Sequence, residues 1–428
     1  MKKTLSLVTL LFVALSARAA DRIVVTVAND SGLARPAETI TVPFAQIRAL
    51  LDPDHVDQYW INRARVPVVR FENLLVKDAA GNAVPSQVTN LDTKFGRNYE
   101  YNDLLFQHDF AAGEKSATFT IEAVATQVPP YPSKVYCRFV PDRDDDFAWE
   151  NDLIAHRIYG PGLELPTAGP DLMPVGGSGV DVWSKRFPYF IIDRWYNKDH
   201  NALHTETGEG LDMYETGQAR GDGGTGVWDG QTLHVSRDFR TWKVMANGPI
   251  RAEFELGYEA WDAGNGAKVS EVKRYIMDAG HYLDQVESTF TVTGADEVTI
   301  GIGLTEHTAR SDNAQVFPAN EEKGLWESVW EIYRANGQFG TGLVLSPDAR
   351  FAGFAKSQKN DPPSTGLRPD DLILVKVKNG ETVRFYAGAA WENLGSIKTA
   401  DQWTAYLAAM AERLRAPVKV SLALEGAK

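Results

Sequence analysis

The sequence is short of cysteine, of basic charge and of long apolar runs, and each shortage narrows what the chain can be. Cys137 is the only cysteine among 428 residues, so no intramolecular disulfide can form and a hydrophobic core must stabilise the fold. The formal net charge of −13 argues against nucleic acid as a partner. No apolar run is long enough to span a bilayer, so we expect no membrane insertion.

The motifs of the commonest cofactor-dependent enzymes are also missing. We find no nucleophile elbow, phosphate loop, dinucleotide fingerprint or zinc helix motif, and we therefore expect no cofactor. His200 and His204 could ligate a metal together with Asp212, but the segment has no zinc-type spacing and no cysteine. We predict no metal site and leave open a structural calcium on Asp and Glu oxygens.

The first residues have the three parts of a signal peptide. Lys2 and Lys3 precede a short apolar run over 5–15, and Ala17 and Ala19 give the small-x-small pattern before a cleavage site. We predict that residues 1–19 are removed and that the rest is periplasmic or secreted, two locations that the sequence does not separate.

Runs of β-branched residues bounded by Gly, Pro, Asn and Asp predict strands over most of the chain. They lie at 22–26, 39–42, 68–71, 117–124, 251–258, 270–277, 282–292, 297–304, 342–345, 372–377, 382–389 and 418–424. Helical spacing is limited to a short segment at 44–51 and a long one at 400–415. A tight turn at Asn379 and Gly380 is expected to join one pair of strands.

This pattern predicts a mainly all-β fold, a large antiparallel β-sandwich or supersandwich of the sugar-epimerase and polysaccharide-lyase type, with a C-terminal helix packed on it. No repeat or linker divides the chain, so we expect one domain over 20–428. Within it, 20–130 would form a first sandwich layer, 131–260 a loop-rich site region, and 261–428 the remaining strands and the helix.

Three segments, 149–161, 185–224 and 303–310, hold an unusual share of ionisable and aromatic residues. In the first, alternation places Arg157 and Tyr159 on one strand face and His156 on the other, where we interpret it as a core histidine. Arg157 could grip a carboxylate and lower the pKa of Tyr159 enough for acid–base work. The alternative is a structural ion pair between Glu150 and Arg157.

The second segment is where we expect the site, because its glycines let the backbone bend around a ligand. The alternative interpretation of this segment is a solvated loop that takes no part in catalysis. Together with the first segment and His307, it supplies the candidate catalytic residues Tyr159, Tyr196, His200, His204 and His307. The candidate substrate-binding residues are Glu150, Arg157, Trp183, Lys185, Lys198, Asp212, Tyr214 and Arg220.

In the third segment, Glu306 and His307 follow a predicted strand, at the kind of strand end where a sandwich often opens its cleft. Adjacent residues point to opposite faces of a continuing strand, so only one of the two would face that cleft. We favour His307 for proton transfer, against the alternative that it decorates a turn.

Long motifs carry a resemblance to a known family: RFVPDRDDDFAWENDLIAHRIYGPGL, GVDVWSKRFPYFIIDRWY, HTETGEGLDMYETGQARGDGG and RFYAGAAWENLGSIKTADQWTAYL. Over nearly all of the chain, the sequence resembles exported bacterial proteins catalogued only as a domain of unknown function. Such proteins are often encoded beside enzymes that degrade pectin and other uronate-rich glycans. The resemblance implies a galactose-mutarotase-like or lyase-like sandwich. Where the family often has Lys-Val-Gly, this chain has Glu215, Thr216 and Gly217.

The leading functional hypothesis is an enzyme that acts on acidic oligosaccharides. For β-elimination, Arg157 or Arg220 would neutralise the uronate carboxylate, and a Tyr or His would remove the adjacent proton. For hydrolysis, two carboxylates from Glu150, Asp152, Asp212 and Glu306 would act instead. The alternatives are a sugar epimerase or mutarotase and a non-catalytic glycan-binding protein. An oligosaccharide is the expected partner, and the oligomeric state stays open.

Overall fold

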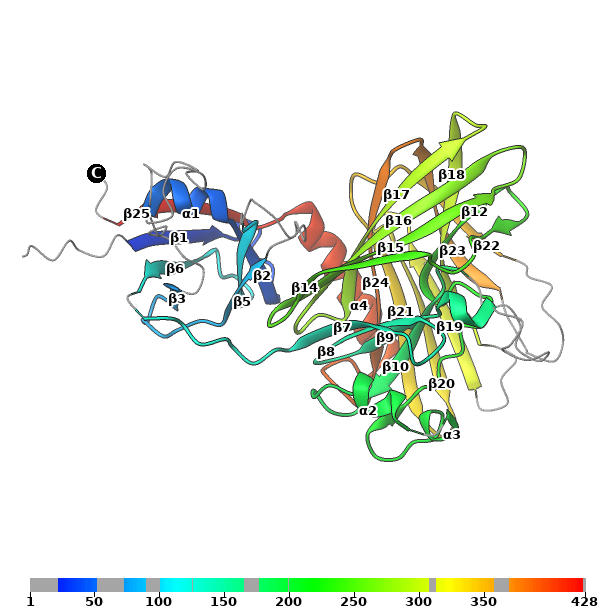
Figure 1. Cartoon of the computed structure of the whole chain (residues 1–428), viewed down its shortest axis with the longest axis horizontal. Coiled ribbons are helices and arrows are strands. Elements are labelled where there is room, and N and C mark those ends of the chain that lie inside the picture. The colour runs from blue at the N-terminus through cyan, green and yellow to red at the C-terminus, as the bar shows by residue number, and fades with distance from the viewer. Residues whose placement is uncertain are drawn as a thin grey trace, which may run out of the picture.

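The computed structural model of the chain describes residues 22–51, 73–89, 101–124, 126–164, 177–198, 200–307, 313–357 and 369–425. The predicted signal peptide and the predicted strand at 68–71 lie outside these ranges. The expected class is confirmed: the described chain is mainly antiparallel β-sheet with one long helix near its C-terminal end (Figure 1).

The first strands form a small sandwich of their own. One sheet has the order β25-β1-β6-β3 and the other β2-β5-β4, with helix α1 against them. Alternation sets its core: in β1, Ile23, Val25 and Val27 are buried between half-exposed neighbours. The elements are β1 (Arg22–Ala28), β2 (Arg35–Pro43), α1 (Phe44–Leu51), β3 (Leu74–Asp78), β4 (Ser86–Thr89), β5 (Asp103–Phe110), β6 (Ser116–Ala123) and β25 (Lys419–Leu424).

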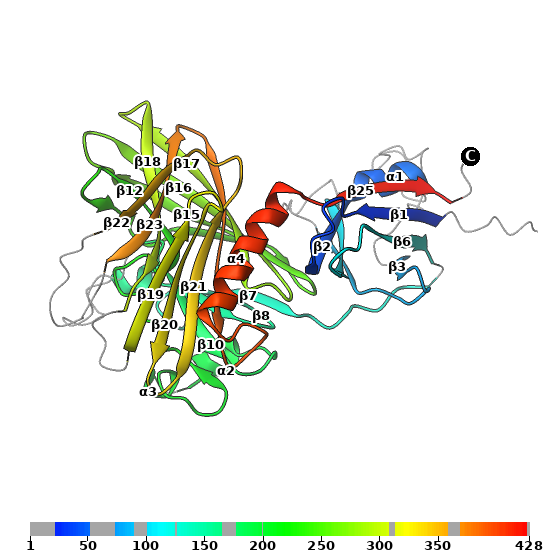
Figure 2. The same cartoon turned by 180° about the vertical axis from the view of Figure 1, so that it is seen from behind.

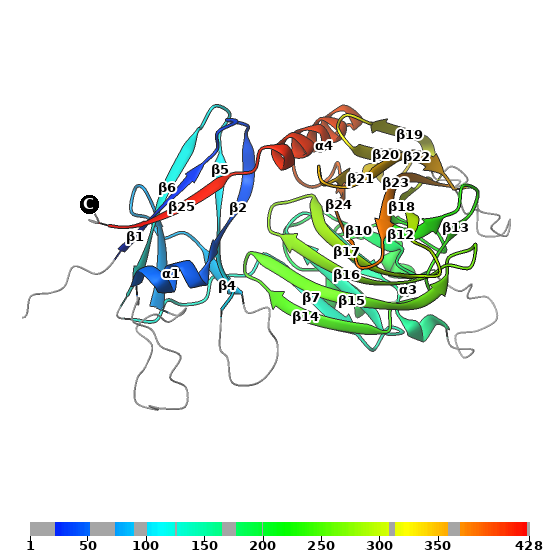
Figure 3. The same cartoon turned by 90° about the horizontal axis from the view of Figure 1, so that it is seen from above.

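The last strand, β25, returns across the molecule to pair antiparallel with the first. Ile23 lies opposite Leu424 and Ala28 opposite Lys419, so both ends of the described chain share one sheet (Figure 3). The sequence predicts 20–130 as the first layer of one larger sandwich. In the structure these strands pair with one another and with β25, and they enclose a separate core, because their apolar faces meet each other.

The large sandwich packs an eight-stranded sheet against two five-stranded sheets. The large sheet has the order β14-β15-β16-β17-β24-β21-β20-β19, and the others β11-β10-β9-β8-β7 and β13-β12-β18-β23-β22. The strands of the smaller sheets are β7 (Val135–Val140), β8 (Asp146–Asn151), β9 (Ala155–Ile158), β10 (Val180–Lys185), β11 (Gly210–Leu211), β12 (Asp222–Trp228), β13 (Leu233–His234), β18 (Glu297–Thr305), β22 (Phe351–Lys356) and β23 (Asp370–Lys378). Those of the large sheet are β14 (Thr241–Asn247), β15 (Arg251–Asp262), β16 (Lys268–Asp278), β17 (Leu283–Thr293), β19 (Asn313–Glu321), β20 (Trp326–Tyr333), β21 (Gly337–Leu345) and β24 (Thr382–Trp391).

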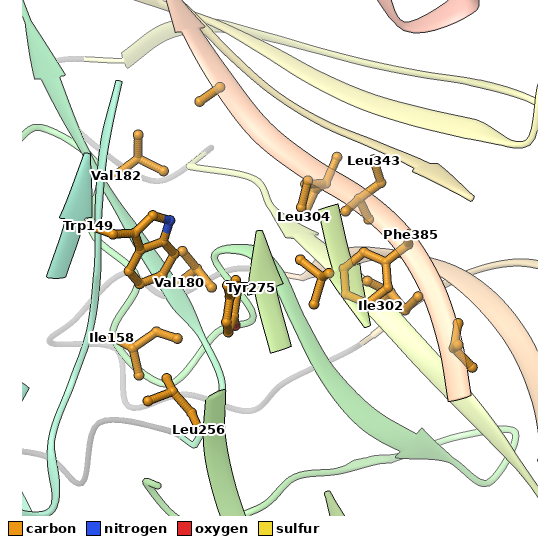
Figure 4. Packing of buried hydrophobic residues seen from close by; sticks show 14 of the residues in the cluster. Trp149, Ile158, Val180, Val182, Leu256, Tyr275, Ile302, Leu304, Leu343 and Phe385 are labelled. Carbon is orange, nitrogen blue, oxygen red and sulfur yellow. The ribbon is translucent and has the colours of Figure 1, made fainter. Parts of the chain in front are cut away.

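A single apolar core joins these three sheets. Trp149 and Val180 from one small sheet and Ile302 from the other meet Tyr275 and Phe385 of the large sheet (Figure 4). The Tyr275 ring lies 5.0 Å from that of Trp149. Aromatic side chains of this size each bury a large apolar area, and this is the stabilisation that a chain without disulfides requires.

The turn at Asn379 and Gly380 is present, but it does not make the expected hairpin. Gly380 has φ of +80°, which glycine adopts without strain. β23 before the turn pairs with β18 and β22, whereas β24 after it pairs with β17 and β21. The turn therefore carries the chain from one sheet of the sandwich to the other.

Helix α4 (Ala400–Arg415) lies against the outer face of the large sheet (Figure 2). The Thr399 side chain accepts a hydrogen bond from the Gln402 amide and caps its N-terminus. Trp403 is buried and donates its indole hydrogen to the Thr341 carbonyl at 2.9 Å. A Cβ on Gly342 would lie 2.8 Å from the Trp403 ring, so glycine there lets the helix dock.

Glutamine side chains join the two sandwiches. Gln87 of β4 donates to the Arg251 carbonyl at 2.9 Å and accepts from the Ile250 and Arg251 amides at 2.7 Å each. Gln107 of β5 donates to the Ala279 carbonyl at 2.9 Å. These bonds satisfy backbone groups at two turns of the large sandwich and fix the small one beside it. No helix in the described ranges has the length and apolar character needed to cross a membrane.

Candidate functional site

The first two predicted segments meet on the outer face of the sheet that contains β8, β9 and β10. In β9, Ala155 packs outward with Trp183 and Trp195, whereas Ile158 packs inward in the main core. Arg157 therefore points outward, as the alternation predicts. Helices α2 (Ile192–Tyr196) and α3 (His200–Leu203) follow β10 along this part of the chain.

His156 points inward and is a core residue. Its ring lies 3.5 Å from Asp222 and 3.3 Å from Asp284, and all three side chains are buried. Burial lowers the pKa of His156, but the two carboxylates outweigh it and raise the pKa to about 9. The interpretation of a core histidine holds, with the addition that this one carries charge.

On the outer face, Arg157, Tyr159, Asp181, Trp183 and Asp212 form what we call the Arg157 cluster. Arg157 Nη2 lies 2.5 Å from Asp181 Oδ2, 3.5 Å from Asp212 Oδ2 and 3.0 Å from the Tyr159 hydroxyl. The guanidinium also lies 5.2 Å from the Trp183 ring. The Arg157 side chain is only 4% exposed, so two carboxylates of the protein already balance its charge out of reach of solvent.

The pKa of Tyr159 is not lowered by Arg157 as expected. Burial raises the pKa of Tyr159 strongly, and the opposite effect of Arg157 is too small to offset it. The carboxylates of Asp181 and Asp212 raise it further. The phenol stays neutral because the positive charge beside it is already matched.

Tyr196 reaches a different carboxylate. Its hydroxyl lies 3.3 Å from Asp146 Oδ2, and Asp146 also accepts a hydrogen bond from the Gly160 amide at 3.1 Å. Burial raises the pKa of Asp146 to about 6 and places the pKa of Tyr196 well above its usual value. Tyr196 is therefore a neutral hydrogen-bond donor.

Glu150 and Lys185 form a buried ion pair at 2.6 Å, with neither side chain exposed. Glu150 also accepts hydrogen bonds from the Ile191 and Ile192 amides, and Lys185 donates to the Asn151 carbonyl. The partner of Glu150 is thus Lys185, not Arg157 as the structural alternative supposed. The pair attaches the start of α2 to β8 and β10.

Of the remaining residues of the second segment, His204 adjoins the Arg157 cluster and the others are dispersed. His204 Nδ1 lies 3.0 Å from the Asp212 carbonyl and 3.8 Å from Asp212 Oδ2, and its side chain is 40% exposed. Lys198 pairs with Glu209 at 2.9 Å. Arg220 is buried and donates to the Thr225 and Gln218 carbonyls. His200 lies in α3, and its side chain is outside the described part of the structure.

His307 is fully buried at the end of β18. Its Nδ1 lies 2.9 Å from Glu331 Oε2 and its Nε2 lies 2.8 Å from the Glu215 carbonyl, while the Tyr214 ring packs 4.6 Å away. Both ring nitrogens therefore lie within hydrogen-bond distance of oxygen atoms of the protein. His307 and Tyr214 thus hold the 214–215 segment against β20, and neither contacts solvent.

On the other side of the same strand end, Glu306 meets charged residues from three further strands. Lys356 of β22 lies 2.7 Å from Glu306 and 3.5 Å from Asp371 of β23. Strand register brings them together, because Asp371 pairs with Leu304 on one side and with Lys356 on the other. We call Glu306, Glu327, Lys356 and Asp371 the Glu306 cluster.

The Glu306 cluster has more carboxyl groups than cations. Burial raises the pKa of Asp371 to about 7, helped by a hydrogen bond to Glu306 and by its charge. Burial, Asp371 and Glu306 raise the pKa of Glu327 in the same way. Within the described residues, Asp371 Oδ2 and Glu327 Oε2 are buried without a hydrogen-bond partner. The Lys356 side chain is 45% exposed, so the cluster reaches solvent at this residue.

Sequence reasoning named Glu306 but missed Glu327, Lys356 and Asp371. Two adjacent aspartates at 370–371 just before a predicted strand were the available signal, since they mark a second strand end beside that of Glu306. Among the residues that the structure describes, no three His, Cys, Asp or Glu side chains are arranged to hold a metal ion.

Several known proteins are similar to this chain. Uncharacterized protein P7 of Formosa agariphila is 32% identical over 408 residues, which cover 93% of each chain. Two solved structures from Enterococcus faecalis, a protein in glycosyl hydrolase family 38 and an alpha-mannosidase, match with TM-scores of 0.49 at 11% and 10% identity. They cover 94% of this chain, which spans about half their length (47% and 46%), and this likeness carries no argument about activity. The motifs' indication of an uncharacterised domain family is confirmed: residues 27–420 match the family described as Domain of unknown function (DUF4861), and the chain belongs to it.

Proposed function

We propose that the protein is an exported enzyme that hydrolyses glycosidic bonds in uronate-containing oligosaccharides from pectin-like glycans, using Glu306 and Asp371. The observation that carries the proposal is the carboxyl pair itself: Glu306 and Asp371 lie 2.7 Å and 3.5 Å from the same ammonium group, that of the partly exposed Lys356. The substrate class rests on the family resemblance of the sequence motifs, and export rests on the predicted signal peptide.

The two carboxyl groups can divide the work of hydrolysis. Asp371, with a pKa raised to about 7 by burial and by Glu306, keeps its proton near neutral pH and can donate it to the leaving oxygen. Glu306, which lies 2.7 Å from Lys356, can attack the anomeric carbon as the nucleophile, the role of the second carboxyl group in a closely spaced pair. The glycosidic carbon–oxygen bond breaks as Asp371 gives its proton to the leaving oxygen. Water then hydrolyses the glycosyl ester of Glu306, and Asp371 takes back a proton from that water.

Hydrolysis is favoured over β-elimination because the arginine and tyrosine side chains that elimination was expected to use are unsuited to it. Arg157 and Arg220 are buried and engaged with groups of the protein. Tyr159 has a raised pKa and is a poor base. Lys356 is the exposed cation of the Glu306 cluster, and it can face a uronate carboxylate next to the scissile bond.

The test measures absorbance at the unsaturated-uronate band and release of reducing ends in parallel, with pectic, glucuronan and ulvan oligosaccharides as substrates. We expect reducing ends without absorbance. Glu306→Gln should lower kcat/KM by roughly 10²–10⁴-fold or more, because it removes the attacking group. Glu297→Gln is the matched control, because Glu297 lies at the other end of β18 and pairs with Arg350.

Three results would overturn the proposal. A rise in absorbance would establish a lyase, and full activity of Glu306→Gln would remove the Glu306 cluster from the chemistry. No cleavage of any of the three substrates would favour an epimerase or a binding protein. Circular dichroism of each variant separates lost chemistry from lost folding.

A further inference from the structure

Two aromatic side chains stand out from the surface on the loop between β10 and α2. Phe187 is 44% exposed and Tyr189 is 43% exposed. Their rings are almost parallel, with an interplanar angle of 8° and centroids 5.5 Å apart. Rings at this separation overlap only in part, so open ring surface faces solvent. Exposing two large apolar rings side by side costs solvation free energy that the fold alone does not explain.

The loop holds this pair in place through Glu209. The Tyr189 hydroxyl donates to Glu209 at 2.8 Å, Arg194 Nε donates to the same carboxylate at 2.8 Å, and the Arg194 guanidinium lies 5.6 Å from the Tyr189 ring. Burial raises the pKa of Glu209, but hydrogen bonds from Lys198, Tyr189 and Arg194 outweigh it and lower the pKa to about 2. The carboxylate is thus always ionised near neutral pH, and the ring orientation is set before any ligand binds.

We propose that Phe187 and Tyr189 form a stacking platform for the pyranose rings of an oligosaccharide, at a subsite separate from the Glu306 cluster. The expected ligand class, an oligosaccharide, rests on the proposed function, whereas binding at the platform does not require that the protein hydrolyses its ligand. The apolar face of a sugar ring packs on an aromatic ring, and the sugar hydroxyls need polar partners around it. Arg194 is 61% exposed and its guanidinium lies beside the Tyr189 ring, so it can offer donors at the rim.

The size of the patch decides between a sugar and a protein. Two aromatic side chains offer roughly 300–500 Å² at most, whereas a stable protein interface buries roughly 800 Å² on each partner. The other large exposed apolar side chains of the described residues are Trp242, Val272 and Phe317, on β14, β16 and β19. They lie on strands and not on the loop that carries Phe187 and Tyr189. The two rings alone offer too little area for a protein partner, and a small ligand with an apolar face fits them best.

The test uses native gel electrophoresis through gels that contain galacturonan, glucuronan or ulvan. Every protein carries Glu306→Gln, so that the polymer is not cut during the run. We expect retardation of this parent by at least one polymer and a Kd weakened roughly tenfold or more by Phe187→Ala or Tyr189→Ala, the usual loss at an aromatic anchor. Phe317→Ala is the matched control, because Phe317 is 45% exposed on another strand.

A further variant separates stacking from anchoring. Tyr189→Phe keeps the ring and removes the hydroxyl that Glu209 binds, so it should weaken binding less than Tyr189→Ala. The inference is overturned if no polymer retards the parent, or if Phe187→Ala migrates like the parent in each gel. If the parent is retarded but the wild-type protein cleaves no substrate, the platform is supported and the proposed hydrolysis is wrong. If the wild-type protein cleaves a substrate but Phe187→Ala binds as tightly as the parent, the hydrolysis is supported and the platform is wrong.

Discussion

The Arg157 cluster and the Glu306 cluster both bury several charges, but they balance them differently. Around Arg157 two carboxylates flank one guanidinium that solvent barely reaches. Around Lys356 three carboxyl groups gather near one ammonium that is 45% exposed. Within the described residues, both clusters contain buried atoms without a hydrogen-bond partner, namely Arg157 Nε and Trp183 Nε1 in the first and Asp371 Oδ2 and Glu327 Oε2 in the second. Breaking a buried ion pair that solvent barely reaches costs stability, whereas a cluster that reaches solvent and raises the pKa of Asp371 to about 7 keeps a proton available near neutral pH. We therefore assign a structural role to the Arg157 cluster and a catalytic role to the Glu306 cluster.

The largest expected effect tests the chemical role of the Glu306 cluster. Asp371→Asn removes the group that would donate a proton, so kcat/KM should fall by roughly 10²–10⁴-fold. Wild-type activity should decline as the pH rises through about 7, where Asp371 loses its proton, and the residual activity of the variant should lack that limb. Initial rates from pH 5 to pH 9 check both points, and an unchanged high-pH limb would assign the acid to another residue.

The next effect tests the structural role of the Arg157 cluster. Arg157→Met leaves Asp181 and Asp212 buried without their cation, so we expect a loss of about 3–5 kcal/mol in the free energy of unfolding. Urea denaturation measures this loss. Turnover per folded molecule should stay near the wild-type value, and its collapse in a folded variant would return Arg157 to the catalytic site.

A smaller effect follows from the neighbour of the Arg157 cluster, Asp146. Its pKa is raised to about 6 by burial, so the stability it contributes is present below about pH 4 and is lost as the pH rises through 6. Asp146→Asn should remove this dependence and gain about 1–3 kcal/mol relative to wild type between pH 4 and pH 8. The measurement is the denaturation midpoint of the wild type and of Asp146→Asn at pH 4 and at pH 8. Equal changes of midpoint in both proteins between these pH values would contradict the prediction.

The smallest effect is expected at Tyr159. Its hydroxyl hydrogen bonds with Arg157 at 3.0 Å, so Tyr159→Phe should cost about 1 kcal/mol in stability and change kcat/KM less than about twofold. Thermal unfolding and initial rates measure the two quantities. A hundredfold loss of turnover would restore the tyrosine-based elimination that the raised pKa of this phenol argues against.

Local patterns were enough to predict much of the fold. The helices at 44–51 and 400–415 agree with α1 and α4 residue for residue, and the predicted strands that fall in described ranges lie within or overlap observed ones. Pairing partners were not predictable in the same way. Nothing local at Asn379 tells whether the next strand joins the same sheet, because that choice depends on which apolar faces meet across the sandwich.

The candidate site was predictable only in part for the same reason. Glu306 was named from its place at a strand end, but its partners come from β20, β22 and β23, and no spacing in the sequence encodes their convergence. Tyr159 was misjudged because its pKa depends on Asp181 and on burial, neither of which alternation reveals. A motif can thus name a charged residue, whereas the charge balance around it is a property of the assembled sheets.

The pairing of β25 with β1 also fixes an order of events for a growing chain. All the described strands between Val135 and Trp391 belong to the large sandwich, so it can close before β25 is made. The small sandwich cannot, because one neighbour of β1 is β25, the last of the described strands. Until that strand arrives, β1 presents an unpaired edge of the kind that recruits other chains. A protein shortened at its C-terminus would keep that open edge permanently and would be expected to self-associate through it.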